Sequence, residues 1–239
     1  MLTDHFLDSA IIIGSKIYWD RYYDCSTKYM IIDNIKRHTS KRVYEESRGV
    51  FAKNRGLISK YLEEFGKEYI NKKRKLDYTK MYESIDRFTG KFFAQNRLGE
   101  KEKKTIRNFK ERNFEEFKNI ILDICGIEEL KRKVRTSLND AIDFIDNECY
   151  TDEKAKIYLY SDCPSNYKST ECHRLCKIIN YEPDVLILLD SHHIKIHHIE
   201  NDVFFITSDH EHILNNKVEI ESIIRGIFLA DVENEKFDI

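Results

Sequence analysis

Four acidic residues stand where a metal-dependent hydrolysis could use them. Asp8 interrupts the apolar run FLDSAIII, Asp209 ends the apolar run VFFITSD, Asp184 opens PDVLILLD, and Glu46 lies in a helical pattern begun by Ser40. If these carboxylates converge in the fold, their mutual repulsion calls for cations, and hard oxygen ligands suit Mg²⁺ or Mn²⁺. Such ions activate water and stabilise an in-line displacement at phosphorus. We therefore expect a Mg²⁺ or Mn²⁺ site at which chemistry of this kind is possible.

Three further residues are candidate supports for this site. Thr207 precedes Asp209 by two residues in a predicted strand, so both side chains point the same way and the hydroxyl could orient a ligand. Asp190 lies six residues beyond Asp184, roughly 240° around a helix, which favours an outer position over a shared face. Asp162 follows the predicted strand KIYLYS and is either a group at the same sheet edge or an ordinary turn residue.

The elements that must position these residues alternate between strand and helix at both ends of the chain. We predict strands over 5–13, 156–161, 203–209 and 227–232, and helices over 28–38, 40–53, 169–179, 183–195 and 211–226. Four helices are expected between 55 and 150, with breaks near Leu76-Asp77, Leu98-Gly99 and Gly126. Buried strands alternating with helices favour a parallel sheet covered on both faces, at whose carboxyl edge ligands gather. The expected organisation is an α/β domain made of residues 1–54 and 151–239, with 55–150 as a helical insertion.

Composition narrows the class of protein. The 239 residues hold 14 Tyr and 14 Phe but only two Pro, which favours a folded, helix-rich chain. No apolar run approaches the ~20 residues of a membrane span, and MLTDHFLD lacks the features of a signal peptide. We therefore expect a cytoplasmic protein with no membrane contact, and no disulfide framework among its six cysteines.

Four segments also resemble those of PIN-domain nucleases. FLDSAIIIG is similar to the family's opening strand with its first acid at Asp8, and SKRVYEES to its second element with Glu46, beside which Glu45 competes. PDVLILLDSHHIK resembles the helix that carries the third acid, Asp184, and VFFITSDHEHIL resembles the segment that ends in Thr-x-Asp at Asp209. The resemblance covers roughly 1–50 and 155–232. It implies a three-layer α/β/α sandwich and a metal-dependent ribonuclease, with RNA favoured over DNA.

The chain also departs from that family pattern. Ser9-Ala10 follows Asp8 where the family often has Thr-Asn or Ser-Asn, so the Asn amide is missing. An alternative function is therefore a catalytically inactive PIN-like module that binds RNA or protein.

The basic residues of the insertion leave its partner open. Residues 1–140 hold 31 Lys and Arg against 22 Asp and Glu, whereas 141–239 hold 9 against 20. Basic stretches such as 71–75, 101–112 and 131–135 are interleaved with Tyr and Phe, a pattern that suits a nucleic-acid backbone and unstacked bases. A protein partner, a homo-oligomer surface or a simple solvated face explains the same pattern.

Two clusters raise the question of a transition metal. Cys163, Cys172, His173 and Cys176 offer zinc ligands, although their spacing fits no standard finger and buried cysteines are common. His193 and His197 are four residues apart and could share a metal if that segment is helical, or they are surface histidines at a helix end.

Overall fold

One parallel sheet organises the α/β part of the molecule. The computed structural model describes residues 3–70, 78–122, 126–150 and 157–234. The strand order is β3–β4–β2–β1–β5–β6, and every neighbouring pair is parallel, which confirms the predicted α/β class and sheet. The strand bounds are Thr3–Leu7 (β1), Ile35–Ser40 (β2), Cys149–Tyr150 (β3), Ile157–Tyr160 (β4), Val203–Thr207 (β5) and Ile227–Asp231 (β6).

The strand order reverses at β1. Strands β2, β4 and β3 lie on one side of β1, whereas β5 and β6 lie on the other. Chain connections on the two sides therefore diverge beyond the carboxyl ends of β1 and β5, and such a switch point is where parallel sheets bind ligands.

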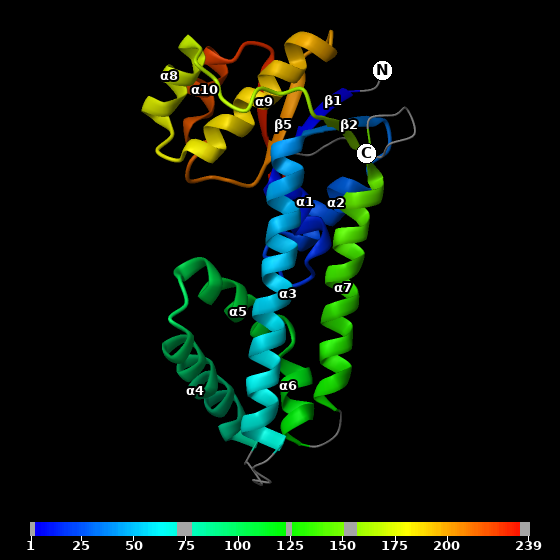
Figure 1. Ribbon diagram of the computed structural model, residues 1–239, viewed down its shortest axis with the longest axis vertical. Coiled ribbons are helices and arrows are strands. Elements are labelled where there is room, and N and C mark those ends of the chain that lie inside the picture. Colours follow the sequence, from blue (N-terminus) through cyan, green and yellow to red (C-terminus); the bar gives the residue numbers. More distant parts are fainter. Residues whose placement is uncertain (1–2, 71–77, 123–125, 151–156, 235–239) are drawn as a thin grey trace.

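Helices cover both faces of the sheet, an arrangement consistent with three layers (Figure 1). One group packs against β2, β5 and β6 and consists of α8 (Thr170–Ile178), α9 (Glu182–His198) and α10 (Lys217–Ile223), the last preceded by the 3₁₀ turn η1 (Leu214–Asn216). The other group consists of α1 (Ser9–Lys16), α2 (Tyr23–Met30) and the sheet-proximal parts of α3 (Lys41–Ile70) and α7 (Ile127–Glu148). No helix in the described ranges combines the length and apolarity that a bilayer crossing requires.

A helical arm, residues 55–148, extends away from the sheet. Helices α3 and α7 pack along each other. Helices α4 (Tyr78–Asn96) and α6 (Phe114–Ile121) lie beside their distal halves, and α5 (Glu100–Arg112) lies nearer the α/β part (Figure 1). Its centre is a cluster of aromatic rings, which are Tyr61, Phe65, Phe88, Phe92, Phe109 and Phe117. Trp19, from the α1–α2 connection, meets Phe109 edge-on with ring centroids 5.2 Å apart, so this aromatic core continues into the α/β part.

The junction at residue 54 is helical. Helix α3 passes through the predicted boundary without interruption, so the arm is joined to the α/β part by continuous helix rather than by a flexible linker. One of the four helices expected in the arm is two helices, α5 and α6, in the structure. The segment 106–124 is divided at Asn113, whose buried side chain donates to Phe109 O and accepts from the Tyr18 hydroxyl at 2.7 Å.

Two predictions near the N-terminus were wrong. The predicted strand 5–13 ends at Leu7, and Ile11 and Ile12 are buried on α1, because a short apolar run fits a buried helix as well as a strand. The predicted helix 28–38 ends at Met30. Asn34 has a positive φ of 64°, and the chain then enters β2 between β1 and β4.

Elements in the second half follow the predictions more closely. The predicted strands 203–209 and 227–232 correspond to β5 and β6, and Ser169 caps α8 by accepting a hydrogen bond from Cys172 N at 3.2 Å. The predicted helix 211–226 is wrong at its start, because Asp209 and its neighbours form a turn and the α-helix covers only Lys217–Ile223.

Candidate metal centre

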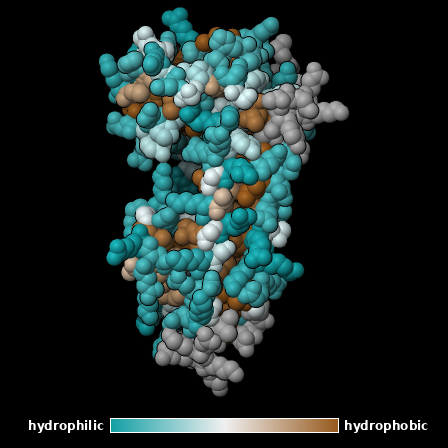
Figure 2. Space-filling model, in the orientation of Figure 1, coloured by the Kyte–Doolittle hydropathy of each residue, from teal (hydrophilic) through white to brown (hydrophobic). Residues whose placement is uncertain are grey.

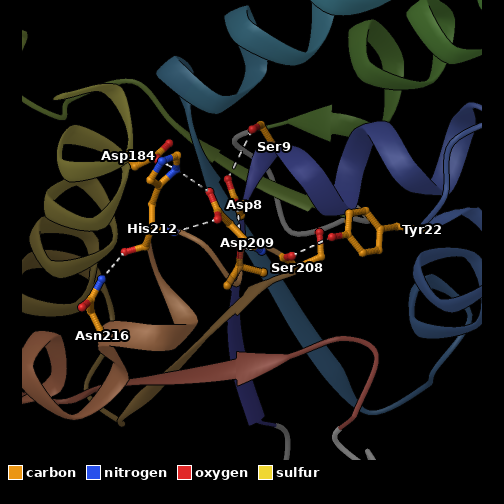
Figure 3. Close-up of polar contacts among 9 residues, drawn as sticks. Asp8, Ser9, Tyr22, Asp184, Ser208, Asp209, His212 and Asn216 are labelled. Carbon is orange, nitrogen blue, oxygen red and sulfur yellow. Dashed lines mark hydrogen bonds and ion pairs between the residues drawn. The ribbon is translucent and has the colours of Figure 1, made fainter. Parts of the chain in front are cut away.

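The four predicted carboxylates lie around one cavity of about 540 Å³ at the switch point of the sheet. Asp8 follows β1, Asp209 follows β5 by two residues, Asp184 lies in the first turn of α9, and Glu46 lies in the second turn of α3. We call this the acidic cavity. Figure 3 shows Asp8, Asp184 and Asp209 directed toward one another from their separate elements.

Asp8 is buried but retains two hydroxyl donors. The Thr207 hydroxyl donates to Oδ2 at 2.7 Å, and the Ser9 hydroxyl lies 3.3 Å from Oδ1. Burial raises the pKa of Asp8 to about 6, and the negative charges of Glu46 and Asp209 add to that rise while the bond from Thr207 opposes it. Thr207 also accepts from Asp209 N at 3.1 Å, so one hydroxyl positions two of the acids.

His212 is a member of the site that the sequence analysis missed. Its Nδ1 lies 3.2 Å from Asp184 Oδ2 and 3.2 Å from Asp209 Oδ2, and the three side chains offer ligand atoms within 4.8 Å of one another. His212 N also donates to Asp209 Oδ1 at 3.0 Å. The sequence feature that could have identified it is its position three residues after Asp209. A tight turn at the end of a strand brings a side chain at that distance back to the same edge of the sheet.

Asp184 experiences the strongest repulsion of the acids in the cavity. Burial raises its pKa to about 7, and the neighbouring charges of Asp8, Asp209 and Glu46 raise it further against the opposing effect of His212. Although His212 Nδ1 is close, Asp184 Oδ2 is buried and accepts no hydrogen bond from the described residues. The buried Ser208 hydroxyl, which also lines the cavity, is likewise without a partner among them.

This donor set fits a hard divalent cation. Within the described ranges, no Lys or Arg lies within 4 Å of a carboxylate oxygen of the four acids. Buried carboxylates without protein cations are costly, and an unpartnered carboxylate oxygen is what an oxygen-preferring ion would use. Asp184 and Asp209, with His212 beside them, would hold such an ion, and Asp8 and Glu46 add carboxylates to the lining of the same cavity.

The two neighbouring glutamates have separate environments. Glu46 lines the acidic cavity, and its charge raises the pKa of both Asp8 and Asp184. Glu45 is not among the lining residues, and it lies 3.7 Å from Lys41 on the exposed side of α3. The structure therefore places Glu46, rather than Glu45, at the site.

Asp190 and Asp162 lie away from the acidic cavity. Asp190 is fully buried, and its carboxylate accepts from the Tyr167 hydroxyl at 2.8 Å and from Arg42 Nε at 3.3 Å. Asp162 follows β4, which is separated from β1 by β2, and its Oδ2 lies 2.7 Å from His198 Nε2. Of the two alternatives for Asp162, the structure therefore does not support a group of the acidic cavity, because the chain after β4 turns toward the C-terminal end of α9.

A basic and aromatic rim faces the acids. Arg21 and Tyr22 from the α1–α2 connection, Tyr181 ahead of α9, and Lys101 from α5 of the arm all line the same cavity. Lys101 Nζ lies 5.3 Å from the centre of the exposed Tyr181 ring, and that ring stacks on His212 with centroids 5.9 Å apart. Figure 2 shows a hollow between the α/β part and the arm with hydrophilic residues on both sides.

The cysteine cluster forms no metal site among the described residues. Cys163, Cys172, His173 and Cys176 do not bring three ligand atoms together, and Nδ1 of His173 instead lies 2.9 Å from Ser169 O at the start of α8. Cys163, Cys172 and Cys176 are free thiols. His193 and His197 both lie on helix α9, the condition under which they could share a metal, and their ring centres are 4.4 Å apart.

Comparisons with protein-family models, with curated proteins and with solved structures found no match.

Proposed function

We propose that this protein is a Mg²⁺- or Mn²⁺-dependent nuclease that cleaves RNA in preference to DNA. The observation that carries the proposal is the meeting of Asp8, Glu46, Asp184 and Asp209, from elements far apart in sequence, without a neutralising Lys or Arg contact among the described residues. The four acids appear in the chain order of the PIN-domain segments they resemble, and the preference for RNA rests on that resemblance.

The chain's own residues have distinct roles in this proposal. A divalent ion bound there would supply a Lewis acid for water and for the phosphoryl oxygens. Thr207 and Ser9 orient the Asp8 carboxylate, and His212 hydrogen-bonds Asp209 while its Nδ1 lies 3.2 Å from Asp184 Oδ2. Fixed ligand orientation of this kind strengthens metal binding.

The rim residues are suited to a nucleic-acid strand. Arg21 and Lys101 offer cations to phosphates entering a cavity whose acids would otherwise repel them. The exposed rings of Tyr181 and the partly exposed Tyr22 offer faces on which unpaired bases stack. A single-stranded segment that passes between the arm and the α/β part fits this combination better than a rigid duplex.

An inactive PIN-like module is the second candidate, because Ala10 lines the cavity where the family often has an amide. Ser9 and Thr207 supply hydroxyl donors to Asp8 in this chain, and we therefore favour activity over binding alone.

The decisive experiment compares Asp209→Asn with the wild-type protein on end-labelled single-stranded RNA and DNA of one sequence. We expect Mn²⁺-dependent cleavage of RNA that EDTA abolishes and that Asp209→Asn reduces about 100-fold or more, because a metal-holding charge is lost. Glu45→Gln removes one charge outside the cavity and is the matched control, with activity retained.

Each other outcome identifies a different error. Equal cleavage by Asp209→Asn would refute the assigned site. Saturable Mn²⁺ binding in calorimetry that depends on Asp209, without cleavage of either nucleic acid, would support the inactive module instead.

A further inference from the structure

A second group of ligand-type side chains lies at the C-terminal end of α9. Asp162, from the β4–α8 connection, meets His193 and His198, and their ligand atoms lie within 4.8 Å of one another. Asp162 Oδ2 is 2.7 Å from His198 Nε2 and 3.8 Å from His193 Nε2. His198 is 14 residues beyond Asp184, about 21 Å along the helix, so this group is separate from the acidic cavity.

A simple hydrogen bond accounts for only part of this arrangement. Asp162 and His198 form one, but His193 Nε2 is directed at the same carboxylate oxygen from beyond hydrogen-bond distance. Neither ring nitrogen of His193 has a hydrogen bond to another described residue. Its ring is also largely shielded, with the side chain only 18% exposed. Two imidazole nitrogens and one carboxylate oxygen thus face a common point, and one of the nitrogens lacks a partner of its own.

The ligands are richer in imidazole than those of the acidic cavity, where His212 stands among four carboxylates. Two imidazoles with a carboxylate suit Zn²⁺ and related transition metals, whereas Mg²⁺ prefers oxygen ligands alone. The Asp162 side chain is 54% exposed, which leaves the group open to solvent for entry of an ion and for a water ligand. His197, whose ring centre is 4.4 Å from that of His193, is a candidate for a fourth ligand.

We propose that Asp162, His193 and His198 bind one transition-metal ion of the Zn²⁺ type, independently of the nuclease site. Such an ion would fasten the β4–α8 connection to the end of α9. Tighter binding or more free Zn²⁺ would stabilise the fold more, because a ligand that binds only the native state lowers the population of the unfolded state.

The test is a Zn²⁺ titration of the full chain without an affinity tag, by calorimetry in excess Mg²⁺, which occupies oxygen-only sites. We expect about one strongly bound Zn²⁺ per chain, and a loss of affinity of about 10-fold or more in both His193→Ala and His198→Ala. Substituting Co²⁺ should give the visible absorption bands of a low-coordinate site in the wild-type protein and not in the variants. Circular dichroism checks that each variant is folded, and Asp162→Asn provides a conservative second probe.

Two control variants separate this site from its neighbours. Cys172→Ser with Cys176→Ser removes the two thiols of α8, and Asp209→Asn changes the acidic cavity. Both should retain the strong Zn²⁺ site. The proposal is overturned if the wild-type chain binds no Zn²⁺ under these conditions, or if binding survives in His193→Ala and His198→Ala.

Discussion

Helix α9 carries two acids, six residues apart, whose surroundings are opposite: Asp184 is half-buried and Asp190 is fully buried. Asp190 receives hydrogen bonds from Tyr167 and Arg42, whereas Asp184 Oδ2 receives none from the described residues and faces the charges of Asp8 and Asp209. Burial raises the pKa of both acids. The partners therefore distinguish them: Asp190 is satisfied by the protein, and Asp184 is suited to an ion from outside.

The largest expected effect is on the free energy of unfolding of the metal-free protein, when Asp190 and Asp184 are substituted in turn. Asp190→Ala leaves Arg42 and Tyr167 without their partner, and breaking such a buried pair costs about 3–5 kcal/mol. Asp184→Asn removes a repelled charge and should leave the free energy of unfolding unchanged or raise it. Urea unfolding at pH 8 in EDTA measures both values. Comparable losses in the two variants would contradict the distinction.

The pH dependence of stability sharpens the same contrast. The pKa of Asp184 rises from an ordinary value near 3.8 to about 7 on folding, and that of Asp8 rises to about 6. Between the ordinary and the raised pKa the native state binds more protons than the unfolded state. These two carboxyl groups therefore make stability fall as pH rises from about 4 to about 7, by up to about 1.4 kcal/mol for each unit of pKa shift.

A difference measurement isolates this effect. His5, whose pKa is lowered to about 4 by burial, acts in the opposite direction below pH 6.5, as do the other histidines with lowered pKa values. The measurement is the difference in the free energy of unfolding between the wild-type protein and Asp184→Asn, across pH 4–8 in EDTA. The variant should gain relative stability as pH rises, and saturating Mg²⁺ should cancel that gain. A flat difference would show that folding does not raise the pKa of Asp184.

The smallest expected effect concerns Asp8, which combines features of the other two acids. It belongs to the repelled group, yet the Thr207 hydroxyl donates to it. Thr207→Val keeps the shape and removes the hydroxyl, and loss of such a ligand-orienting bond should weaken Mn²⁺ binding about 10–100-fold. Calorimetry measures the affinity, and Thr207→Ser should restore most of it. Equal affinity in the Val variant would mean that Thr207 only contributes to the strand.

The positions of Asp184 and Asp209 could be predicted from sequence because each marks the start or end of an apolar element, whereas Glu46 was identified by the resemblance of its segment and Asp8 was expected inside a longer strand. Asp209 ends a clear β-strand and Asp184 follows Pro183 at a helix start, so a parallel sheet brings them to one edge. The role of His212 depends on the turn that follows Asp209, which periodicity does not encode, and a long helix was expected there instead.

Other errors have the same origin in tertiary context. Ile11 and Ile12 are apolar in a strand or a helix alike, and their burial on α1 is decided by packing against α3 and β5. For Asp162 the sequence left open a group at the site's sheet edge or a turn residue, and the position of β4 beyond β2 separates it from the acidic cavity. Hydrophobic pattern thus identified the layers, whereas the approach of distant segments decided which polar groups meet.

The unbroken course of α3 has a mechanical consequence. Glu46 stands near one end of this helix, and Tyr61 and Phe65 anchor the other end in the aromatic core of the arm, about 22–28 Å away. A rod of this kind transmits tilt instead of absorbing it. A molecule that binds the tip of the arm and tilts α3 would therefore move Glu46, the acid that α3 contributes to the cavity.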